Sequence, residues 1–181
     1  MRHIRLPSVI HPSKIRIIML HEGLPEHKQD YFYTSRDSLY VTNTIAAFQA
    51  AGKDVHSMDD VVKLGVYLTV AVRAVRKDLT FSPQTIDEHS FALEQELALF
   101  PNVKVILLMG DAAIRALNCI AKRRYGAKAV PSGSTYKIRK GKFFFGDIRV
   151  FPSYLQTGRN FLIEKSKQRM VAEDIRIAFS I

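Results

Sequence analysis

A carboxylate and an imidazole stand side by side just after the first apolar run of the chain. His21-Glu22-Gly23-Leu24-Pro25 follows a run of β-branched and apolar residues between positions 15 and 20. A carboxylate in this place can position a water molecule or stabilise developing positive charge, and a histidine can donate to an anion. Both residues also have plainer interpretations. Glu22 could be a solvated loop residue or a charge at a helix N-terminus, and a lone histidine is more often structural. Glu26 and Asp30 are further carboxylate candidates.

Three aromatic side chains follow in the segment Asp30-Tyr31-Phe32-Tyr33. Enzymes that act on a nucleobase take the base out of its stack and hold it against aromatic faces. Phe32 and its neighbour Tyr31 could provide such faces. The alternative is that these rings complete the hydrophobic core.

The segment from Phe151 to Asn160 combines polar donors, an apolar residue and a cation. Such donors suit phosphate oxygens, and an apolar wedge offsets the unstacking of a base by filling the gap it leaves. Leu155 is the apolar residue of this segment, and the other contacts expected from the segment are Ser153, Tyr154, Gln156, Thr157 and Arg159. Phosphate contacts are also expected from Arg73, Arg76 and Lys77, and from Arg139, Lys140 and Lys142. The plainer interpretation is a loop before a well-capped helix.

The elements that would position these residues alternate along the chain. Four apolar runs predict strands at 15–20, 66–72, 103–109 and 147–151. Helices are expected at 44–51, from Ser57 to Gly65, from Ser82-Pro83 to Pro101, from Gly110 to Lys122, and from an Asn160 cap onward. The run 139–142 is expected to turn a small hairpin between 135–138 and 143–145. This alternation predicts a three-layer α/β/α fold with a four-stranded, mostly parallel sheet.

In such sheets a ligand binds outside the carboxyl ends of the strands. The segments to inspect are therefore 21–33, 73–77, 110–111 and 152–160. No spacing of His21, His27, His56 and His89 recommends a metal site, and no cofactor is expected.

Length and composition fit one globular domain spanning 1–181, with its core at about 14–179. The charge is unevenly placed. The chain carries 12 Lys/Arg and 13 Asp/Glu through Ile114, but 15 Lys/Arg and 4 Asp/Glu from Arg115 onward. A basic half is the electrostatic footprint of a polyanion binder. A single cysteine excludes a disulfide framework, and neither a signal peptide nor a membrane span is evident. A cytoplasmic monomer is expected.

In the order of its segments the sequence resembles the uracil-DNA glycosylase superfamily over roughly residues 14–175. His21–Pro25 resembles the first motif, Val66–Arg73 a strand that ends in a base-reading side chain, and Phe151–Gln156 the second motif. A fourth likeness is the helix–strand–Gly-x-x-Ala block that ends at Ala113. The likeness is strongest to a bacterial branch that shares the segments Asp30–Tyr33 and Phe151–Tyr154.

The resemblance implies roles for these residues. Glu22 would support the sugar cation or a water molecule, His21 and Gly23 would adjoin the base, and Phe32 would stack on it. Thr69 would read the edge of the base, and Leu155 would probe the duplex. Two positions depart from the pattern, because Phe151 replaces a motif histidine and Thr69 or Val70 replaces a base-reading asparagine.

These observations predict a metal-independent DNA glycosylase for uracil or a related base, acting in base-excision repair. Its expected partner is DNA, single-stranded DNA included. One alternative is a nucleic-acid-binding module that has lost chemistry, which the two departures favour. Another is an enzyme for small nucleobases or nucleotides, whose pocket would not need the basic half.

Overall fold

The computed structural model describes residues 6–77 and 80–181. Its centre is a sheet of five strands in the order β2-β1-β3-β5-β4. The strands are β1 (Ile17–Leu24), β2 (Val66–Val75), β3 (Val105–Met109), β4 (Phe143–Phe145) and β5 (Ile148–Ser153). All neighbours pair in parallel except β4 and β5, which are antiparallel. The predicted α/β architecture is confirmed, with five strands where four were expected.

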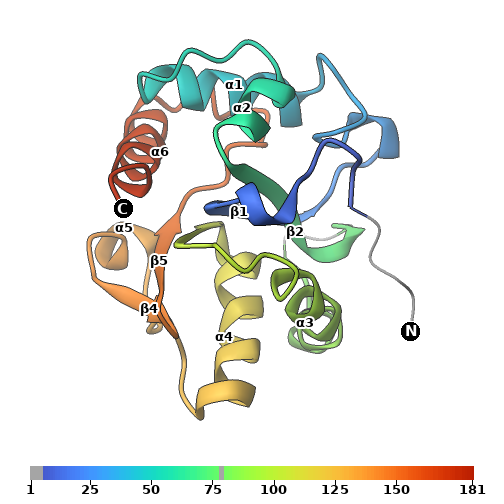
Figure 1. Cartoon of the computed structure of the whole chain (residues 1–181). Helices are drawn as coiled ribbons and strands as arrows, with labels where there is room; N and C mark the ends of the chain where they lie inside the picture. Colours follow the sequence, from blue (N-terminus) through green and yellow to red (C-terminus); the bar gives the residue numbers. More distant parts are fainter. Residues whose placement is uncertain (1–5, 78–79) are drawn as a thin grey trace.

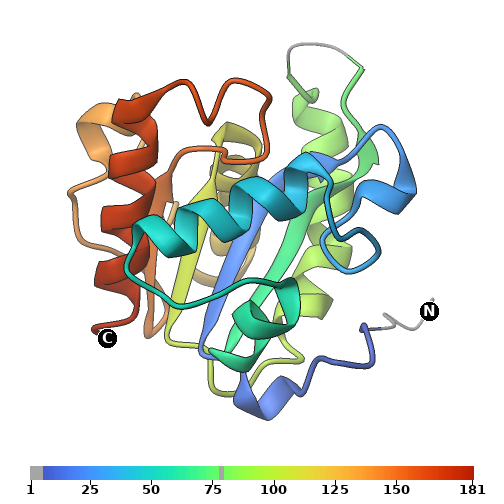
Figure 2. The same ribbon diagram turned by 90° about the horizontal axis from the view of Figure 1, so that it is seen from above.

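Helices cover both faces of the sheet (Figure 1). One face packs against α3 (Pro83–Leu97) and α4 (Asp111–Tyr125), and the other against α1 (Leu39–Ala50), α2 (Met58–Lys63) and α6 (Lys165–Ala178). Figure 2 shows α1 crossing the sheet, with α6 beside the last parallel strand. The central strands are buried on both faces, which is why they read as continuous apolar runs in the sequence.

The predicted hairpin is misplaced. Residues Thr135–Ile138 form the short helix α5, and β4 pairs with β5 through a two-residue turn at Gly146 and Asp147. Gly146 has φ +59°, a conformation that glycine adopts without steric cost and that suits a tight hairpin turn. The run 139–142 therefore follows α5 rather than turning a hairpin.

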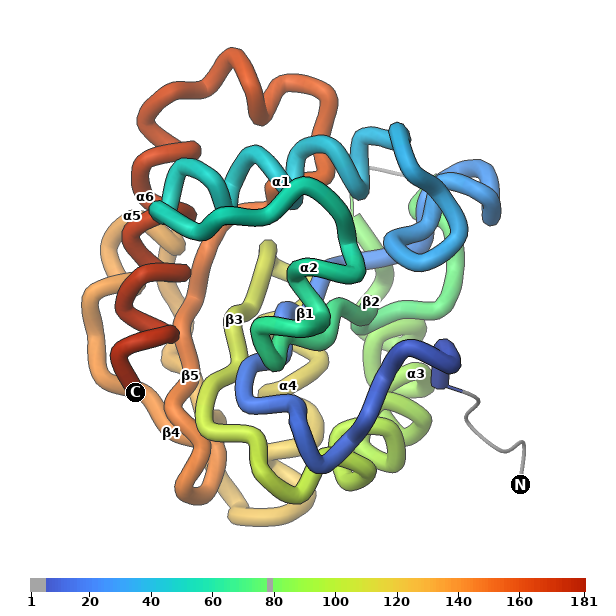
Figure 3. Tube along the Cα trace, turned by 45° about the horizontal axis from the view of Figure 1, so that its top comes forward, coloured from blue at the N-terminus to red at the C-terminus, as the bar shows by residue number. Residues whose placement is uncertain are grey.

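Two helices begin elsewhere than predicted. α1 begins at Leu39 rather than at Thr44, so Asn43, the residue expected to cap a helix over 44–51, lies inside the helix. α6 begins at Lys165, five residues after Asn160, so residues 154–164 form a longer connection than expected. This connection lies beside α1, where the Asn43 amide donates to the carbonyls of Gln156 and Gly158 (Figure 3).

The loop 25–38 covers the free edge of β2. The Tyr33 hydroxyl accepts a hydrogen bond from the Leu68 amide at 2.8 Å and donates to the Leu68 carbonyl at 3.0 Å. The phenol thus satisfies both backbone groups of an edge residue and holds the loop beside the sheet. Among the described residues, no helix has the length and apolar composition needed to cross a membrane.

Candidate active site

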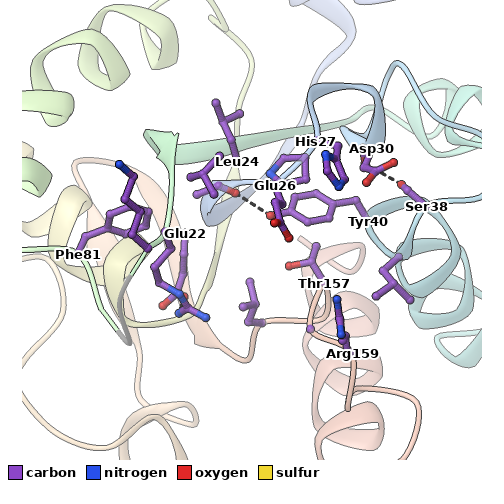
Figure 4. A pocket seen from close by; sticks show the side chains of 18 residues that line it. Glu22, Leu24, Glu26, His27, Asp30, Ser38, Tyr40, Phe81, Thr157 and Arg159 are labelled. Atoms are coloured by element: carbon purple, nitrogen blue, oxygen red, sulfur yellow. Dashed lines mark hydrogen bonds and ion pairs between the residues drawn. The ribbon is translucent and has the colours of Figure 1, made fainter.

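A cavity of about 700 Å³ opens where β1 and β2 end and the connection after β5 begins. Figure 4 shows its lining side chains. They include Glu22, Gly23, Glu26, His27, Asp30, Tyr40, Arg76, Lys77, Phe81, Leu155, Thr157 and Arg159. The cavity therefore lies at the carboxyl edge of the sheet, where ligands bind in open α/β folds. The candidate residues of the sequence analysis that meet here are Glu22, Gly23, Glu26, Asp30, Arg76, Lys77, Leu155, Thr157 and Arg159.

Glu22 is held from two sides. Its Oε1 accepts a hydrogen bond from the Ala112 amide at 3.2 Å, and its Oε2 accepts one from Arg76 Nη1 at 2.8 Å. Ala112 lies in the first turn of α4, where free backbone amides and the helix dipole favour a negative charge. The side chain is only 14% exposed. The carboxylate is thus fixed in orientation at the wall of the cavity.

Charges of both signs line the cavity. Glu26 and Asp30 make no ion pair in the described part of the chain, and Lys77 and Arg159 line the same cavity. Acidic and basic side chains therefore face the same space, which can receive a ligand with both donors and acceptors.

Tyr40 supplies an aromatic ring to the cavity that the sequence analysis did not single out. Its hydroxyl donates to the Gly23 carbonyl at 2.8 Å, and burial raises the pKa of this phenol to about 12, so it stays neutral at ordinary pH. Its place in the first turn of α1 was hidden because the helix was predicted to begin later. Phe81 is a second aromatic lining residue.

His21 does not line the cavity. It is fully buried, with Nδ1 3.3 Å from the Thr69 carbonyl and Nε2 accepting from the Gln156 amide. Burial lowers the pKa of the imidazole to about 4, so the ring is neutral at pH 7. His21 therefore does not reach this cavity, and its role beside the base stays a prediction. The histidine connects β1 to the segment after β5.

Phe32 is fully buried and also lies outside the cavity lining. Its ring centroid lies 4.7 Å from that of His21 and 5.0 Å from that of Tyr40. The core packing that the sequence analysis kept as the alternative is what the structure shows. Tyr31 packs against Phe32 at 5.1 Å, and burial raises the pKa of the Tyr31 phenol. Phe32 is fully buried and Tyr31 is partly exposed, but neither ring lines the cavity, so their stacking roles stay predictions.

Thr69 and Arg73 belong to a separate polar cluster around the buried Glu96. Three groups donate to the Glu96 carboxylate. They are the Thr69 hydroxyl at 2.7 Å, Arg73 Nη2 at 2.6 Å and the Tyr67 hydroxyl at 2.6 Å. Thr69 is 2% exposed, so its hydroxyl cannot reach a ligand in the cavity. The Thr69 hydroxyl is thus directed to Glu96 and its reading role stays a prediction, while Arg73 binds the same internal carboxylate.

The segment after β5 divides into anchors and lining residues. Ser153 is fully buried and donates to Asp174 at 2.6 Å, and Gln156 is fully buried between His21 and Thr44. Neither side chain lines the cavity, and their contacts with DNA stay predictions. Between and beyond these anchors, Leu155 and Arg159 reach the cavity, while Tyr154 is half-buried beside it.

A second anchor lies behind Ser153. Arg139, predicted as a phosphate contact, is 6% exposed and donates to Asp174 at 2.7 Å and Glu173 at 2.8 Å. Burial raises the pKa of Asp174 to about 6 despite these partners. The cluster connects α5, β5 and α6.

The positions that depart from the superfamily pattern, Phe151 and Thr69 or Val70, are buried, and both Phe151 and Val70 are apolar. Phe151 is 4% exposed, its ring centroid is 4.3 Å from the Arg149 guanidinium, and it does not line the cavity. Val70 is 3% exposed. Neither side chain can donate a hydrogen bond to a base, and neither fills the cavity. Among the described residues, no group of three or more His, Cys, Asp or Glu side chains is arranged to hold a metal ion.

No family model matches this chain. One curated protein, named type-5 uracil-DNA glycosylase, from Thermus thermophilus, is 32% identical over 101 residues. The similarity covers 56% of this chain and 46% of that protein, so the chain matches about half the length of its relative.

Proposed function

We propose that this chain is a DNA glycosylase that hydrolyses the bond between deoxyribose and uracil or a related damaged base. Two observations support the proposal: the partial similarity to a type-5 uracil-DNA glycosylase, and a carboxylate fixed at a cavity large enough for a nucleotide. The observation that carries it is the position of Glu22 between the Ala112 amide and Arg76.

The reaction requires a water oxygen to bond to C1′ as the C1′–N bond breaks and its electron pair leaves with the base. Positive charge develops on the sugar, and a carboxylate beside C1′ would stabilise it and orient the water. Glu22 is the candidate for this role. The proton lost by the water passes to Glu22 or solvent, and the departing base takes up a proton.

The departing base needs positive charge or donors nearby. Phe151 is apolar and His21 is neutral, so neither supplies them. Arg76 and Lys77 line the cavity and are the candidates for this electrostatic role. Tyr40 and Phe81 take the place of Phe32 as the aromatic faces against which an extruded base could rest.

Release of uracil from single- and double-stranded oligonucleotides tests the proposal. We expect Glu22→Gln to lower the single-turnover rate by about 10²–10⁴, the usual contribution of a positioned acid or base. Glu26→Gln is the matched control, because Glu26 also lines the cavity but makes no contact with α4. Release by the Glu22 variant at the wild-type rate would contradict the proposed mechanism.

A second candidate is a nucleic-acid-binding module without glycosylase chemistry. The buried Phe151 and Val70 favour it, because each lost donor at a charge-stabilising site commonly costs about 10²–10³ in rate. Binding that weakens with salt, without release of any base from either substrate, would select this alternative.

A further inference from the structure

A second surface of aromatic and basic side chains continues from the cavity toward α5. We define the aromatic–basic surface as Tyr136, Lys137, Lys140, Tyr154 and Lys167. Tyr136 is 75% exposed, an unusual position for a large aromatic ring. None of these five residues lines the cavity described above.

The helix α5 is held in place by a buried side chain. Arg139, at its C-terminal end, donates to the Met170 carbonyl at 3.0 Å and to the carboxylate of Asp174. Figures 1 and 3 show α5 beside α6, as these bonds require. Because Arg139 fixes the inner side of α5, Tyr136 stays exposed on a short helix that cannot turn freely.

Tyr154 connects this surface to the cavity. It lies between Ser153, which Asp174 holds, and Leu155, which lines the cavity. Its ring centroid is 6.0 Å from Lys167 Nζ. Ser153, the residue before Tyr154, and Arg139, three residues after Tyr136, donate to the two oxygens of the same carboxylate, Asp174. The backbone beside Tyr154 and the helix α5 that carries Tyr136 are thus held at one carboxylate.

The charge around these rings is strongly positive. Between Tyr136 and Arg169 the sequence has nine Lys or Arg and two Asp or Glu residues. In the part of the chain that the structure describes, Lys137 and Lys140 make no ion pair, whereas Lys167 pairs with Glu164 at 2.8 Å. Unpaired lysines beside exposed rings provide cations that a polyanion can reach.

We propose that the aromatic–basic surface binds a single-stranded stretch of nucleic acid that flanks the nucleotide in the cavity. Bases stack on Tyr136 and Tyr154, and phosphates bind Lys137, Lys140 and Lys167. Alternation of rings and cations matches the alternation of bases and phosphates along one strand. In a duplex the faces of the bases are stacked on one another, so exposed rings would meet only the backbone. This inference rests on the proposed function in taking DNA as the partner.

Binding of fluorescent oligothymidine, which carries no uracil, to the full chain tests the surface. We expect Tyr136→Ala and Tyr154→Ala each to weaken binding by about five- to a hundredfold, the usual effect of removing one stacking ring. Tyr136→Phe and Tyr154→Phe keep the ring and should keep the affinity. Tyr125→Ala is the matched control, because Tyr125 is a tyrosine 54% exposed at the far end of α4.

A duplex of the same length is the second probe, and alanine at either tyrosine should leave its affinity within about twofold of the wild type. Wild-type affinity of the Tyr136→Ala and Tyr154→Ala variants for oligothymidine would overturn the proposal. So would an equal loss on the duplex, because it would mean that the rings contact the backbone. Thermal unfolding of each variant shows whether a loss comes from misfolding, and in that case the phenylalanine variants decide.

The two proposals fail separately. If uracil is released normally but the tyrosine variants bind oligothymidine like the wild type, the proposed binding surface is refuted and the proposed glycosylase activity is supported. If no base is released but binding depends on Tyr136 and Tyr154, the proposed reaction is refuted and the surface stands.

Discussion

Gly110 leaves the space that the Glu22 carboxylate occupies. A Cβ atom placed on Gly110 would lie 2.7 Å from Glu22 Oε1, closer than such atoms approach in proteins. Gly110 also has φ +108° and ψ 172°, a conformation that residues with a side chain almost never adopt. The strand-to-helix turn at the start of α4 therefore requires glycine for two reasons, and one of them is Glu22.

Gly110→Ala should destabilise the protein and displace Glu22. Forcing a side chain into this backbone conformation costs about 1–3 kcal/mol, which urea unfolding would measure. The added methyl should also break the hydrogen bond from the Ala112 amide, so hydrogen exchange at Ala112 should accelerate and any base release should fall. An unchanged exchange rate at Ala112 would contradict this account.

Gly52→Ala separates the two effects. Gly52 also has positive φ, at +81°, but no heavy atom lies within 4 Å of the place its Cβ would take. We expect this variant to lose stability through backbone strain alone. Its Ala112 exchange rate and its activity should stay those of the wild type.

Gln156→Ala should loosen the connection between β5 and α6. The Gln156 amide donates to His21 and Thr44, and its loss leaves buried groups without partners, at a cost of about 1–3 kcal/mol. Amides of residues 154–164 should then exchange faster. Gln49→Ala, which removes a single bond to the Val55 carbonyl, is the control and should leave this segment protected. Equal protection in both variants would mean that other contacts hold the connection.

The sheet could be predicted from sequence because its central strands are buried on both faces. Runs such as 66–72 and 103–109 are continuous and apolar, so they indicate strands without knowledge of their neighbours. The hairpin was misjudged because Gly141 and Gly146 are both turn residues. Only the pairing of β4 with β5 decides between them.

A site residue could be predicted where its position along a strand brings it to the cavity. It could not be predicted where a partner distant in the sequence determines which way its side chain points. Glu22, near the end of β1, and Leu155, just after β5, reach the cavity because the carboxyl ends of these strands share one edge. Ser153, Thr69 and Gln156 have suitable donors, but Asp174, Glu96 and His21 engage them from far along the chain. Such pairs are 21, 27 and 135 residues apart, and no local pattern reveals them.

Leu155→Ala should impair single- and double-stranded substrates alike. Leu155 lines the cavity, so its truncation removes a contact with the bound nucleotide whichever substrate supplies that nucleotide. We expect kcat/KM to fall by about tenfold or more on both substrates. A wedge that fills the gap in a duplex would instead matter for double-stranded DNA alone. Uracil release from both substrates distinguishes the two roles. Ile163→Ala, at a residue 76% exposed, is the comparison for an apolar side chain outside the cavity.

The buried His21 should make the protein less stable as the pH falls. In the unfolded chain a histidine takes up a proton near pH 6.5, whereas the pKa of His21 in the folded protein is about 4 because burial disfavours the charged ring. Between these values the unfolded state binds more protons, so the free energy of unfolding decreases as the pH is lowered from about 6.5 to about 4. The expected loss is on the order of 3 kcal/mol.

Urea unfolding of the wild type and of His21→Gln at several pH values isolates this contribution, because the variant lacks the ring. Across this window the difference in free energy of unfolding between the wild type and His21→Gln should shrink. His56→Gln, which removes an exposed imidazole, is the control and should produce no comparable change. A difference between wild type and His21→Gln that stays constant from pH 7 to pH 4 would show that His21 is not held neutral by burial. Its assignment as an anchor of Gln156 rather than a cation in the site would then be wrong.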